Sequence, residues 1–383
     1  MRRTALPERR PFGSGPAVSP FCLGTMRATG SAEQMAAVLR AAVAAGINHI
    51  ETAPAYGTAE HFLGLALAEL RQEQPERVAD LVLTSKLLPG LGLAEGQAQL
   101  RQILQRLGIE RLDNLAVHGL NRPEHLDWAL RGAGAELLRW ALDEGLVGQV
   151  GFSSHGENGL IEAALASGRF QFCSLHLHWF DQQRLPLAQA ALKAGLGVLA
   201  ISPADKGGRL YDPPATLLAD CAPYVPLELA YRFLLDQGIS CLSLGAAQAS
   251  DLALAAALNP SGEAWLGPEH RLALETLQQQ GLARLGAEAC HQCQACLPCP
   301  MGVPIPALLR LRNLDVGHGM HAFAEERYNL IGRAGHWWEE RNASACERCG
   351  DCLPRCPHQL PIPDLLADTH QRLASAPRRR LWG

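Results

Sequence analysis

Cysteine is concentrated in two short runs near the C-terminal end of this 383-residue sequence. Eight of the twelve cysteines lie in these runs, and each run ends in Cys-Pro. The first run contains Cys290, Cys293, Cys296 and Cys299, and the second contains Cys346, Cys349, Cys352 and Cys356. Closely spaced cysteines that end in Cys-Pro are typical of proteins that hold two 4Fe-4S clusters. The spacing therefore predicts two such clusters.

We expect the two runs to exchange ligands. In two-cluster ferredoxins the fourth cysteine of each run ligates the other cluster. The expected sets are Cys290, Cys293, Cys296 and Cys356 for one cluster, and Cys346, Cys349, Cys352 and Cys299 for the other. Paired zinc knuckles with four cysteines each are the alternative. The closely spaced third cysteine and the terminal Cys-Pro favour iron-sulfur clusters over zinc.

The two runs also belong to an internal repeat. Residues 300–309 and 357–366 read alike, because both contain Pro-Ile-Pro followed by paired leucines. Proline is tolerated in a first helical turn, where its missing N–H costs nothing, so each Pro-Ile-Pro predicts the start of a helix. Because the runs must meet to exchange ligands, the chain between them is expected to form a compact domain, mostly helical over 302–338.

The composition is that of an ordinary globular chain, with 48% hydrophobic and 19% charged residues and a net charge of −4. A negative net charge argues against nucleic acid as a partner. No stretch approaches the ~20 consecutive apolar residues of a membrane span, and we expect no leader peptide. Cysteines grouped for metal suit a reducing cytoplasm, which is the expected location. The remaining cysteines are expected in the core: Cys22, Cys173, Cys221 and Cys241.

Short apolar runs alternate with amphipathic helical stretches over most of the chain. The expected strands are 21–25, 47–53, 81–86, 115–118, 147–152, 170–177, 197–201 and 239–244. Eight strand-helix units over roughly 250 residues favour a closed (β/α)8 TIM barrel over an open sheet. No Gly-x-Gly-x-x-Gly follows the first strand, which weighs against a Rossmann fold. The predicted fold class is α/β, a TIM barrel followed by a small, mainly α-helical, two-cluster ferredoxin-like domain.

This pattern divides the chain into four expected segments. They are a barrel at 1–262, a connecting helix or linker at 263–284, a helical domain with both clusters at 285–370 and a basic tail at 371–383. The tail carries Arg378, Arg379 and Arg380. We expect it to be a solvated terminus rather than a docking site for an acidic electron carrier.

Polar residues gather at the expected carboxyl ends of the strands, where TIM barrels carry their chemistry. Residues 50–57 read Ile-Glu-Thr-Ala-Pro-Ala-Tyr-Gly, and Thr-Ser-Lys at 84–86 and Ala-Val-His at 116–118 follow. These stretches resemble the catalytic pattern of aldo-keto reductases, which are (β/α)8 barrels that use NADPH or NADH. Residues 148–154 and 244–250 resemble the family's nicotinamide strand and phosphate loop. With the cysteine runs, the chain resembles the subgroup fused to a C-terminal two-cluster ferredoxin domain.

The resemblance implies a catalytic tetrad of Tyr56, Lys86, Glu51 and His118. Hydride reduction of a carbonyl leaves an alkoxide, so Tyr56 is expected to donate a proton to the carbonyl oxygen. Lys86 is expected to lower the pKa of Tyr56 from its usual value near ~10. Glu51 is expected to hold Lys86, and His118 to orient or polarise the carbonyl. The family has aspartate where this chain has Glu51, so the carboxylate or the strand must shift.

The resemblance also implies where a nicotinamide coenzyme is bound. The expected contacts are Ser153, Ser154, Ser174, Ser202, Gly245, Ala246 and Ala247. The last three are expected to offer backbone N–H groups to a phosphate at a helix N-terminus. The same loop contains Gln248 but no lysine or arginine, so little is available to bind a 2′-phosphate by charge. The choice between NADP and NAD stays open.

The sequence thus predicts an iron-sulfur oxidoreductase that transfers hydride between NAD(P)H and a small carbonyl or alcohol. The two 4Fe-4S clusters are expected to relay electrons to a redox partner such as a ferredoxin or a flavin protein. Hydride carries two electrons whereas a cluster carries one, and no flavin motif is visible. One alternative is an electron-transfer or redox-sensing module whose barrel has lost carbonyl chemistry. Another is a metal-dependent hydrolase with ligands among His118, His155, His176 and His178.

Overall fold

The computed structural model describes residues 8–258, 264–333 and 341–376. Of the basic tail expected at 371–383, residues 371–373 belong to a helix that spans Ile362–Leu373, and those from 377 on lie outside these ranges, as does the end of the helical stretch expected to reach residue 338. The chain divides into two compact units. One, here called the barrel unit, comprises Met1–Gly207 and Ala230–Trp265, and the other, the cluster unit, comprises Gly208–Leu229 and Leu266–Gly383.

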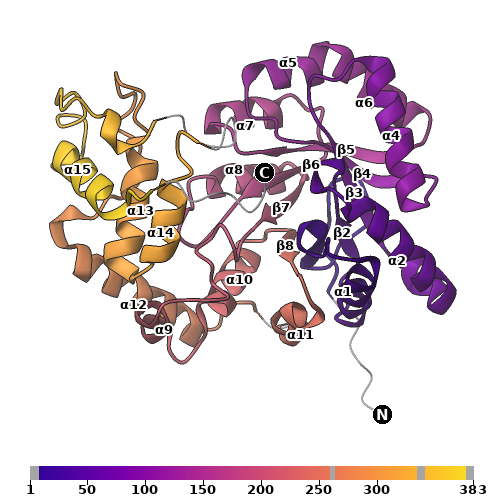
Figure 1. The fold of residues 1–383 in the computed structure, drawn as a ribbon, viewed down its shortest axis with the longest axis horizontal. Coiled ribbons are helices and arrows are strands. Elements are labelled where there is room, and N and C mark those ends of the chain that lie inside the picture. Colours follow the sequence, from indigo (N-terminus) through magenta and orange to yellow (C-terminus); the bar gives the residue numbers. More distant parts are fainter. Residues whose placement is uncertain (1–7, 259–263, 334–340, 377–383) are drawn as a thin grey trace. The chain divides into compact units, whose positions relative to one another are not determined.

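The barrel unit is built on a closed ring of eight parallel strands, in which each strand pairs with its neighbours in the sequence (Figure 1). The strands are β1 (Phe21–Gly24), β2 (His49–Glu51), β3 (Val82–Leu87), β4 (Leu112–Val117), β5 (Val147–Ser154), β6 (Phe172–His176), β7 (Gly197–Ile201) and β8 (Cys241–Gly245). The pairing of β8 with β1 closes the ring. The predicted (β/α)8 barrel is therefore confirmed.

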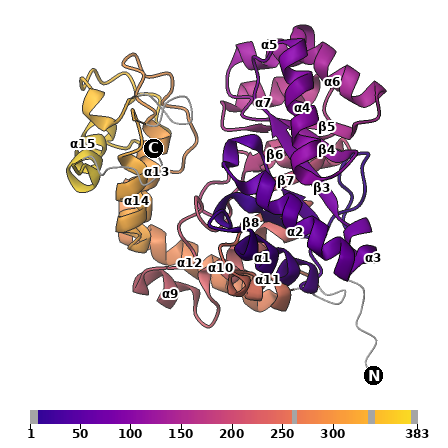
Figure 2. The same ribbon diagram turned by 45° about the vertical axis from the view of Figure 1, so that its right-hand side comes forward.

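Helices cover the outside of this ring (Figure 2). They are α1 (Ala32–Ala44), α2 (Ala59–Glu73), α3 (Pro75–Ala79), α4 (Leu93–Leu107), α5 (Pro123–Arg131), α6 (Ala133–Asp143), α7 (Asn158–Ala166), α8 (Leu185–Lys193), α10 (Pro226–Asp236) and α11 (Ala253–Ala257). Short 3₁₀ helices follow three of the strands: η1 (Thr25–Arg27), η2 (Pro54–Tyr56) and η3 (Ala249–Leu252). None of the described helices is both long enough and apolar enough to cross a membrane.

Local signals in the sequence set the bounds of α1. The hydroxyl of Ser31 accepts a hydrogen bond from the Gln34 N–H at 3.1 Å, and the Gln34 side-chain oxygen accepts one from the Gly30 N–H at 2.8 Å. Gly46 follows the helix with φ of +80°, a left-handed conformation that glycine adopts at little cost. The predicted cap and stop are both present.

The amino-terminal segment fills one end of the barrel. Phe12 is fully buried, with its ring centroid 5.2 Å from that of Phe172 and 5.1 Å from that of His49. Both partners begin their strands, so Phe12 lies at the amino-terminal end of the ring. Full burial of such a ring contributes roughly 1.5–3 kcal/mol. The opposite end, at the carboxyl ends of the strands, is left for polar side chains.

The cluster unit is helical, and its repeat is visible in the backbone. Its helices are α9 (Ala215–Cys221), α12 (Pro268–Leu285), α13 (Ile305–His318), α14 (His321–Tyr328) and α15 (Ile362–Leu373), with the short turns η4 (Gly286–Glu288) and η6 (Ala343–Ala345). Helices α13 and α15 each begin after a proline N-cap, Pro304 with φ and ψ of −79° and 67° and Pro361 with −74° and 63°. Each Pro-Ile-Pro therefore starts a helix, as predicted.

A segment between β7 and β8 belongs to the cluster unit. Gly208–Leu229 contains α9, which lies beside α12 in both views (Figures 1 and 2). The Arg284 guanidinium on α12 donates to both carboxylate oxygens of Asp220 on α9, at 2.6 and 2.7 Å. Sequence analysis assigned this segment to the barrel domain, whereas its contacts group it with the helices that follow the barrel. The cluster unit is therefore assembled from two separate stretches of chain.

A buried arginine joins the two halves of the repeat. Arg312 on α13 is 5% exposed, and its Nε donates to Asp368 Oδ2 on α15 at 2.6 Å. Its Nη2 pairs with the Glu288 carboxylate in η4. Removal of one partner from a buried ion pair leaves the other charges without compensation, which is strongly destabilising. Arg312 therefore holds three segments of the cluster unit together.

We expect Arg312→Ala to destabilise the cluster unit by about 2 kcal/mol, because two carboxylates lose their shared cation. The measurement is the denaturant midpoint for loss of visible cluster absorbance, followed under anaerobic conditions. Arg333→Ala, at an exposed position, is the matched control and should leave the midpoint unchanged. Equal midpoints for both variants would contradict this role of Arg312.

Candidate active site and cluster cavities

Four polar side chains meet at the carboxyl ends of β2, β3 and β4. Glu51 is the last residue of β2, and Lys86 lies one residue before the end of β3. His118 directly follows β4, and Tyr56 ends the short helix η2 that follows β2. Parallel strands of a closed barrel all end at the same rim, so this topology brings together residues that are distant in the sequence.

The ammonium group of Lys86 joins two of these side chains. Its Nζ lies 2.5 Å from Glu51 Oε1 and donates a hydrogen bond to Tyr56 OH at 2.5 Å. Lys86 is 2% exposed and Glu51 is 3% exposed. The His118 ring stands edge-on to Tyr56, with centroids 5.8 Å apart and planes at 89°. The structure thus brings all four residues of the expected tetrad into one group.

The longer side chain of glutamate fits at this position. The second carboxylate oxygen of Glu51, Oε2, accepts a hydrogen bond from Ser243 Oγ on β8 at 3.4 Å. A Cβ placed on Gly24 would stand 2.9 Å from Ser243 Oγ and 3.9 Å from Glu51 Oε2. Glycine in β1 therefore leaves the room that this hydrogen bond occupies, and Glu51 keeps its contact with Lys86.

Burial dominates the electrostatics of the group. Burial raises the pKa of Tyr56, and although the Lys86 ammonium lowers it, the net shift is upward. The expected lowering by Lys86 is therefore present, but loss of hydration outweighs the attraction of one cation, and the pKa of Tyr56 stays above its usual value. Burial also lowers the pKa of Lys86, but the Glu51 carboxylate and Tyr56 outweigh it, and this net shift is upward too. Lys86 is thus charged and Tyr56 protonated at neutral pH.

The histidine of the group is neutral. Burial, followed by the positive charges of Lys86 and Lys206, lowers the pKa of His118 to about 3. A neutral imidazole still carries one N–H and therefore donates a hydrogen bond at physiological pH. His118 is suited to orient a carbonyl oxygen, and it is not suited to act as an imidazolium acid.

Two further imidazoles lie close together at the rim. His155 follows β5 and His176 ends β6, and their Nε2 atoms are 3.2 Å apart. Burial holds the pKa of both well below the usual histidine range, with help from the nearby cation of Lys206. Two neutral rings at this distance share one proton as donor and acceptor. Among the described residues, no three or more His, Cys, Asp or Glu side chains form a group that fits a metal ion, so the geometry does not favour the hydrolase alternative.

Two serines expected to contact the coenzyme have hydrogen bonds within the chain. Ser153 Oγ accepts from the Gly119 N–H at 3.0 Å. Ser154 Oγ donates to the Leu120 carbonyl at 2.6 Å and accepts from the Gly156 N–H at 3.0 Å. The Ser154 hydroxyl therefore links the loop after β4, where it donates to Leu120, to the loop after β5, where it accepts from Gly156.

The other two expected serines lie on β6 and after β7. Ser174 is fully buried, and its hydroxyl has no hydrogen-bond partner among the described residues. A buried hydroxyl without a partner is costly unless a ligand or water satisfies it. Ser202 directly follows β7 with φ of +53°, and its side chain is half-buried. Both serines therefore stay available for a ligand at the rim.

The loop after β8 holds a carboxylate that sequence analysis missed. Asp251 Oδ2 accepts from the N–H groups of Ala247 at 2.8 Å and Gln248 at 3.2 Å. Of the three residues expected to offer N–H groups to a phosphate, Gly245 is exposed, Ala246 is buried, and Ala247 has this internal partner. The spacing of Gln248 and Asp251 is that of a capping box, so a sequence signal was present.

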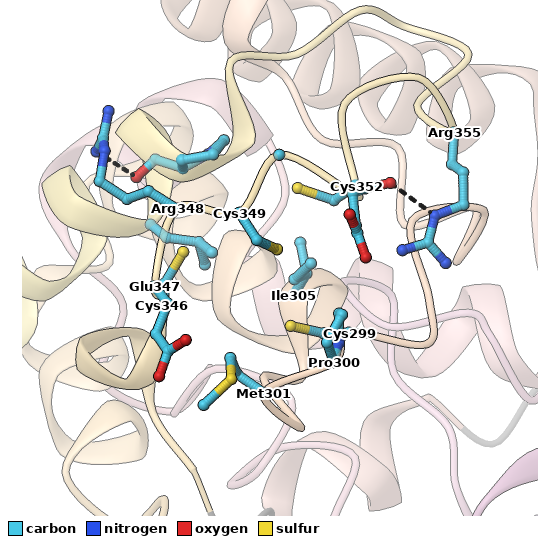
Figure 3. Close-up of a pocket in the computed structure, with 14 residues that line it drawn as sticks. Cys299, Pro300, Met301, Ile305, Cys346, Glu347, Arg348, Cys349, Cys352 and Arg355 are labelled. Atoms are coloured by element: carbon cyan, nitrogen blue, oxygen red, sulfur yellow. Dashed lines mark hydrogen bonds between the residues drawn. The ribbon is translucent and has the colours of Figure 1, made fainter.

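In the cluster unit, four sulfur atoms surround one cavity (Figure 3). The cavity has an empty volume of about 330 Å³ and is bordered by the apolar side chains of Ile305 and Leu366. Its cysteines are Cys299, Cys346, Cys349 and Cys352. Three of these cysteines come from the second run and one comes from the first.

A second cavity of about 310 Å³ is lined by the complementary set. Its cysteines are Cys290, Cys293, Cys296 and Cys356. Ile305 also borders this cavity, so one side chain contributes to the walls of both. Burial raises the pKa of the Cys296 thiol to about 11, with a further rise from Cys290. A thiol must lose its proton to ligate iron, so metal binding here releases protons.

The backbone around the second cysteine of each run winds tightly. Cys293 and Cys349 are each flanked on both sides by residues with positive φ. These residues are Gln292 (+54°), Gln294 (+63°), Arg348 (+57°) and Gly350 (+84°). Non-glycine residues with positive φ cost free energy and persist only where the surrounding structure requires them. The shared conformation indicates that both loops are shaped to place cysteines around a cavity.

These cavities suit a polynuclear group better than a single ion. Zinc holds its thiolates at ≈2.3 Å, and no described group of three or more His, Cys, Asp or Glu side chains is gathered as a single ion requires. Each cavity instead has four sulfurs around a hollow with apolar walls. The two sets of cysteines are those required for crossed ligation, in which the fourth cysteine of each run ligates the cluster of the other run.

Residues 20–212 match the profile of the aldo/keto reductase family. The chain belongs to this family. The match includes Glu51, Tyr56, Lys86 and His118, which are here called the Lys86 group. It ends before β8. An aldo-keto reductase from Mycolicibacterium vanbaalenii is 30% identical over 209 residues, which cover 52% of this chain and 68% of that protein.

Solved structures of other aldo-keto reductases have the same barrel. The holo form of an aldo-keto reductase from Bacillus halodurans has a TM-score of 0.57 and 21% identity, covering 70% of this chain and 95% of that one. An aldo-keto reductase from Bombyx mori, solved in complex with NADP, has a TM-score of 0.56 and 20% identity, covering 71% and 92%. At this level of identity the likeness shows the fold alone.

The cysteine runs match a second profile. Residues 289–362 match the 4Fe-4S dicluster domain, and this segment contains all eight cysteines that line the two cavities. This aldo-keto reductase therefore carries a 4Fe-4S dicluster domain in the same chain. The predicted fusion and the predicted pair of 4Fe-4S clusters are both confirmed.

Crossed ligation makes opposite predictions for two pairs of cysteine variants. Cys293 and Cys356 line the same cavity although they belong to different runs, whereas Cys293 and Cys299 belong to one run but line different cavities. We expect C293A/C356A to lose one cluster and to keep about half of the iron, and C293A/C299A to lose both. Iron and acid-labile sulfide content after anaerobic purification measures the difference.

Cys173→Ala, which removes a buried cysteine of the barrel unit, is the control and should retain all of the iron. The reverse pattern, with half of the iron kept by the same-run pair and none by the cross-run pair, would show that each run binds its own cluster.

Proposed function

We propose that the chain is an iron-sulfur oxidoreductase whose barrel transfers hydride between NAD(P)H and a small carbonyl or alcohol. The observation that carries the proposal is the Lys86 ammonium, which lies 2.5 Å from both Tyr56 OH and Glu51 Oε1. Tyr56 accepts the hydrogen bond from Lys86, so its own proton is left for a substrate oxygen. A hydroxyl held in this way at a barrel rim is suited to protonate an alkoxide.

The mechanism follows from the four side chains. A bound nicotinamide supplies or accepts the hydride. As charge develops on the carbonyl oxygen, Tyr56 donates its proton there and Lys86 stabilises the phenolate that remains. Glu51 holds the ammonium in place, and neutral His118 donates a hydrogen bond that orients the carbonyl. In the direction of alcohol oxidation, the Tyr56 phenolate takes the proton back.

The proposal that the coenzyme is a nicotinamide rests on the family and on the residues at the carboxyl ends of the strands. The relative from Bombyx mori was solved with NADP, and a TIM barrel gathers its ligands at the carboxyl ends of its strands. We propose Ser153, Ser174 and Ser202 as contacts of the coenzyme, with Gly245 and Ala246 in the loop after β8. Ser154, whose hydroxyl proton is bound within the chain, supports the loop beside them.

Hydride transfer passes both electrons of the coenzyme to the carbonyl, so in this proposal the two clusters relay single electrons in a separate step, to and from redox partners such as a ferredoxin or a flavin protein. Cys293 in one cavity and Cys349 in the other are exposed. Each cluster would therefore have one edge at the surface of the unit, where electrons can enter or leave. Solvent-exposed clusters persist best under reducing conditions, so the proposal includes a cytoplasmic location.

A second candidate is an electron-transfer or redox-sensing module whose barrel has lost carbonyl chemistry. The observation that favours it is that Ser154 and the Ala247 N–H, both expected to contact coenzyme, have partners within the chain. The two candidates differ in one measurable property, which is binding of NADH or NADPH. An oxidoreductase of the first kind binds a nicotinamide coenzyme, and a module of the second kind does not.

We expect Tyr56→Phe to lower kcat for carbonyl reduction by at least about 100-fold, because the general acid is lost. Binding of the coenzyme should change by less than about threefold, since such a loss concerns the chemical step alone. A panel of small aldehydes and ketones, assayed anaerobically with NADH and NADPH, provides the measurement. Tyr211→Phe removes the same atom from an exposed tyrosine and should keep full activity. Full activity in Tyr56→Phe would refute the assignment.

The pH dependence of reduction follows from the same group. Tyr56 must be protonated to act as an acid. A free tyrosine has a pKa of ~10, and because the pKa of Tyr56 is raised, its protonated form persists to higher pH. The rate should therefore be level from about pH 5 to 9 and fall only as pH rises through the tyrosine pKa. His118, with a pKa of about 3, stays neutral throughout that range. An inflection near pH 7 in kcat/KM would contradict this account.

A further inference from the structure

The two cysteine runs differ in length by one residue, and that residue is an arginine. The first run ends in Cys296-Leu-Pro-Cys299, whereas the second ends in Cys352-Leu-Pro-Arg-Cys356. Arg355 is therefore the extra residue of the second run. It directly precedes Cys356, the cysteine that this run contributes to the cavity of the other run.

The guanidinium of Arg355 joins the backbones of the two runs. Its Nη2 donates a hydrogen bond to the Pro298 carbonyl at 3.0 Å. Its Nε donates to the Asp351 carbonyl at 2.9 Å (Figure 3). Pro298 directly precedes Cys299, and Asp351 directly precedes Cys352. Because both cysteines line the same cavity, one side chain holds the neighbours of two ligands of one cluster.

A second arginine binds the other end of the segment that carries Cys299. Arg341 Nη1 donates a hydrogen bond to the Met301 carbonyl at 3.1 Å. Residues 298–301, here called the Cys299 segment, therefore accept a guanidinium hydrogen bond at each end. Hydrogen bonds from a charged donor are stronger than those between neutral groups. Both arginines come from the second half of the repeat, so this half holds the cysteine that it receives.

The first run has no cationic side chain to offer in return. Residues 285–309 contain all of the first run and no lysine or arginine. The backbone around Cys356 is bonded within its own loop, because the Cys356 N–H donates to the Leu353 carbonyl at 3.2 Å and the Gln359 N–H donates to the Cys356 carbonyl at 3.1 Å. These bonds do not attach Cys356 to the first run. The two exchanged cysteines are therefore held in different ways.

We propose that Arg355 and Arg341 are positioning residues that clamp Cys299 into the cluster of the second run, and that Cys356 is the more readily released of the two exchanged ligands. A clamped segment keeps a thiolate that leaves its iron close to that iron, so the thiolate rebinds. The cluster with Cys356 is then the one at which an incoming ligand can replace an exchanged cysteine. The proposal rests on crossed ligation and does not depend on the function proposed for the barrel.

Alkylation of released thiolates tests the proposal. The anaerobically purified chain is treated with a ferrous-iron chelator and iodoacetamide. When an iron–sulfur bond breaks, the iron passes to the chelator and the freed thiolate displaces iodide from the reagent. Mass spectrometry of the peptides gives the initial rate of labelling at each cysteine. We expect Cys356 to be labelled at least about fivefold faster than Cys299, since only Cys299 has a clamp of charged hydrogen bonds.

Three variants isolate the hydrogen bonds of Arg355. Arg355→Met keeps the apolar stem and removes the donors, so the ratio of the two rates should fall below about twofold. Arg355→Lys keeps a cation with N–H donors and should retain most of the difference. Arg333→Met removes an exposed arginine elsewhere in the cluster unit and should leave the ratio unchanged. Iron content and far-UV circular dichroism show whether each variant is folded and holds both clusters.

The second cysteine of each run serves as an internal standard. Cys293 and Cys349 are both exposed and lie in loops of shared conformation. Their rates of labelling compare the two clusters as a whole and should agree within about twofold, because neither cysteine lies in the clamped segment. A difference between them as large as that between Cys299 and Cys356 would show that one whole cluster is less stable, which would overturn the role of the clamp.

The remaining outcomes also decide the matter. Labelling of Cys299 as fast as Cys356 in the unaltered protein overturns the proposal. A ratio that Arg355→Met leaves unchanged, or that Arg333→Met lowers equally, overturns the role of Arg355. If Arg355→Met assembles no clusters, Arg341→Met provides the comparison, because it removes only one of the hydrogen bonds. It should lower the ratio at least about twofold, and an unchanged ratio would refute the clamp.

Discussion

The buried ammonium group of Lys86 is the charge on which the arrangement of the barrel rim depends. A buried ammonium loses its hydration and needs both an opposite charge and hydrogen-bond partners. Glu51 supplies the charge, and Tyr56 accepts a hydrogen bond, each at 2.5 Å. Glu51 comes from β2 and Lys86 from β3, and the register that pairs Glu51 with Thr84 places them side by side. Gly24, which has no side chain, leaves room for Ser243 Oγ, which donates a hydrogen bond to the second carboxylate oxygen of Glu51.

In the cluster unit, the arrangement depends on cysteine sulfur atoms that come from both runs. Each cavity needs thiols from both runs, so α13 and α15 must pack against each other before either cavity is complete. Arg312 supports that packing with ion pairs to α15 and η4. The unit is also not a simple C-terminal extension of the barrel. Its helix α9 lies between β7 and β8 in the sequence, and the Asp220–Arg284 pair fastens α9 to α12. The chain therefore passes between the two units three times.

The rim combines side chains that favour carbonyl chemistry with expected coenzyme contacts that have partners within the chain. The Lys86 group and neutral His118 provide a proton donor and an oriented hydrogen bond. The Ser154 hydroxyl and the Ala247 N–H instead have partners within the chain, so two of the expected coenzyme contacts are occupied. Occupation of a donor by an internal acceptor does not abolish a binding site.

The sequence by itself determined the barrel, the two clusters and the residues of the Lys86 group. These follow from local or periodic features: alternating strands and helices, fixed cysteine spacing, and motifs that lie at strand ends. It predicted that Lys86 lowers the pKa of Tyr56 but not that burial outweighs this effect, because burial depends on every segment that covers a side chain and spacing does not report it. It also missed the contact of Asp251 with Ala247 and assigned 208–229 to the barrel. Only the tertiary structure decided these three points, because each depends on which groups are brought into contact and removed from water when the chain folds.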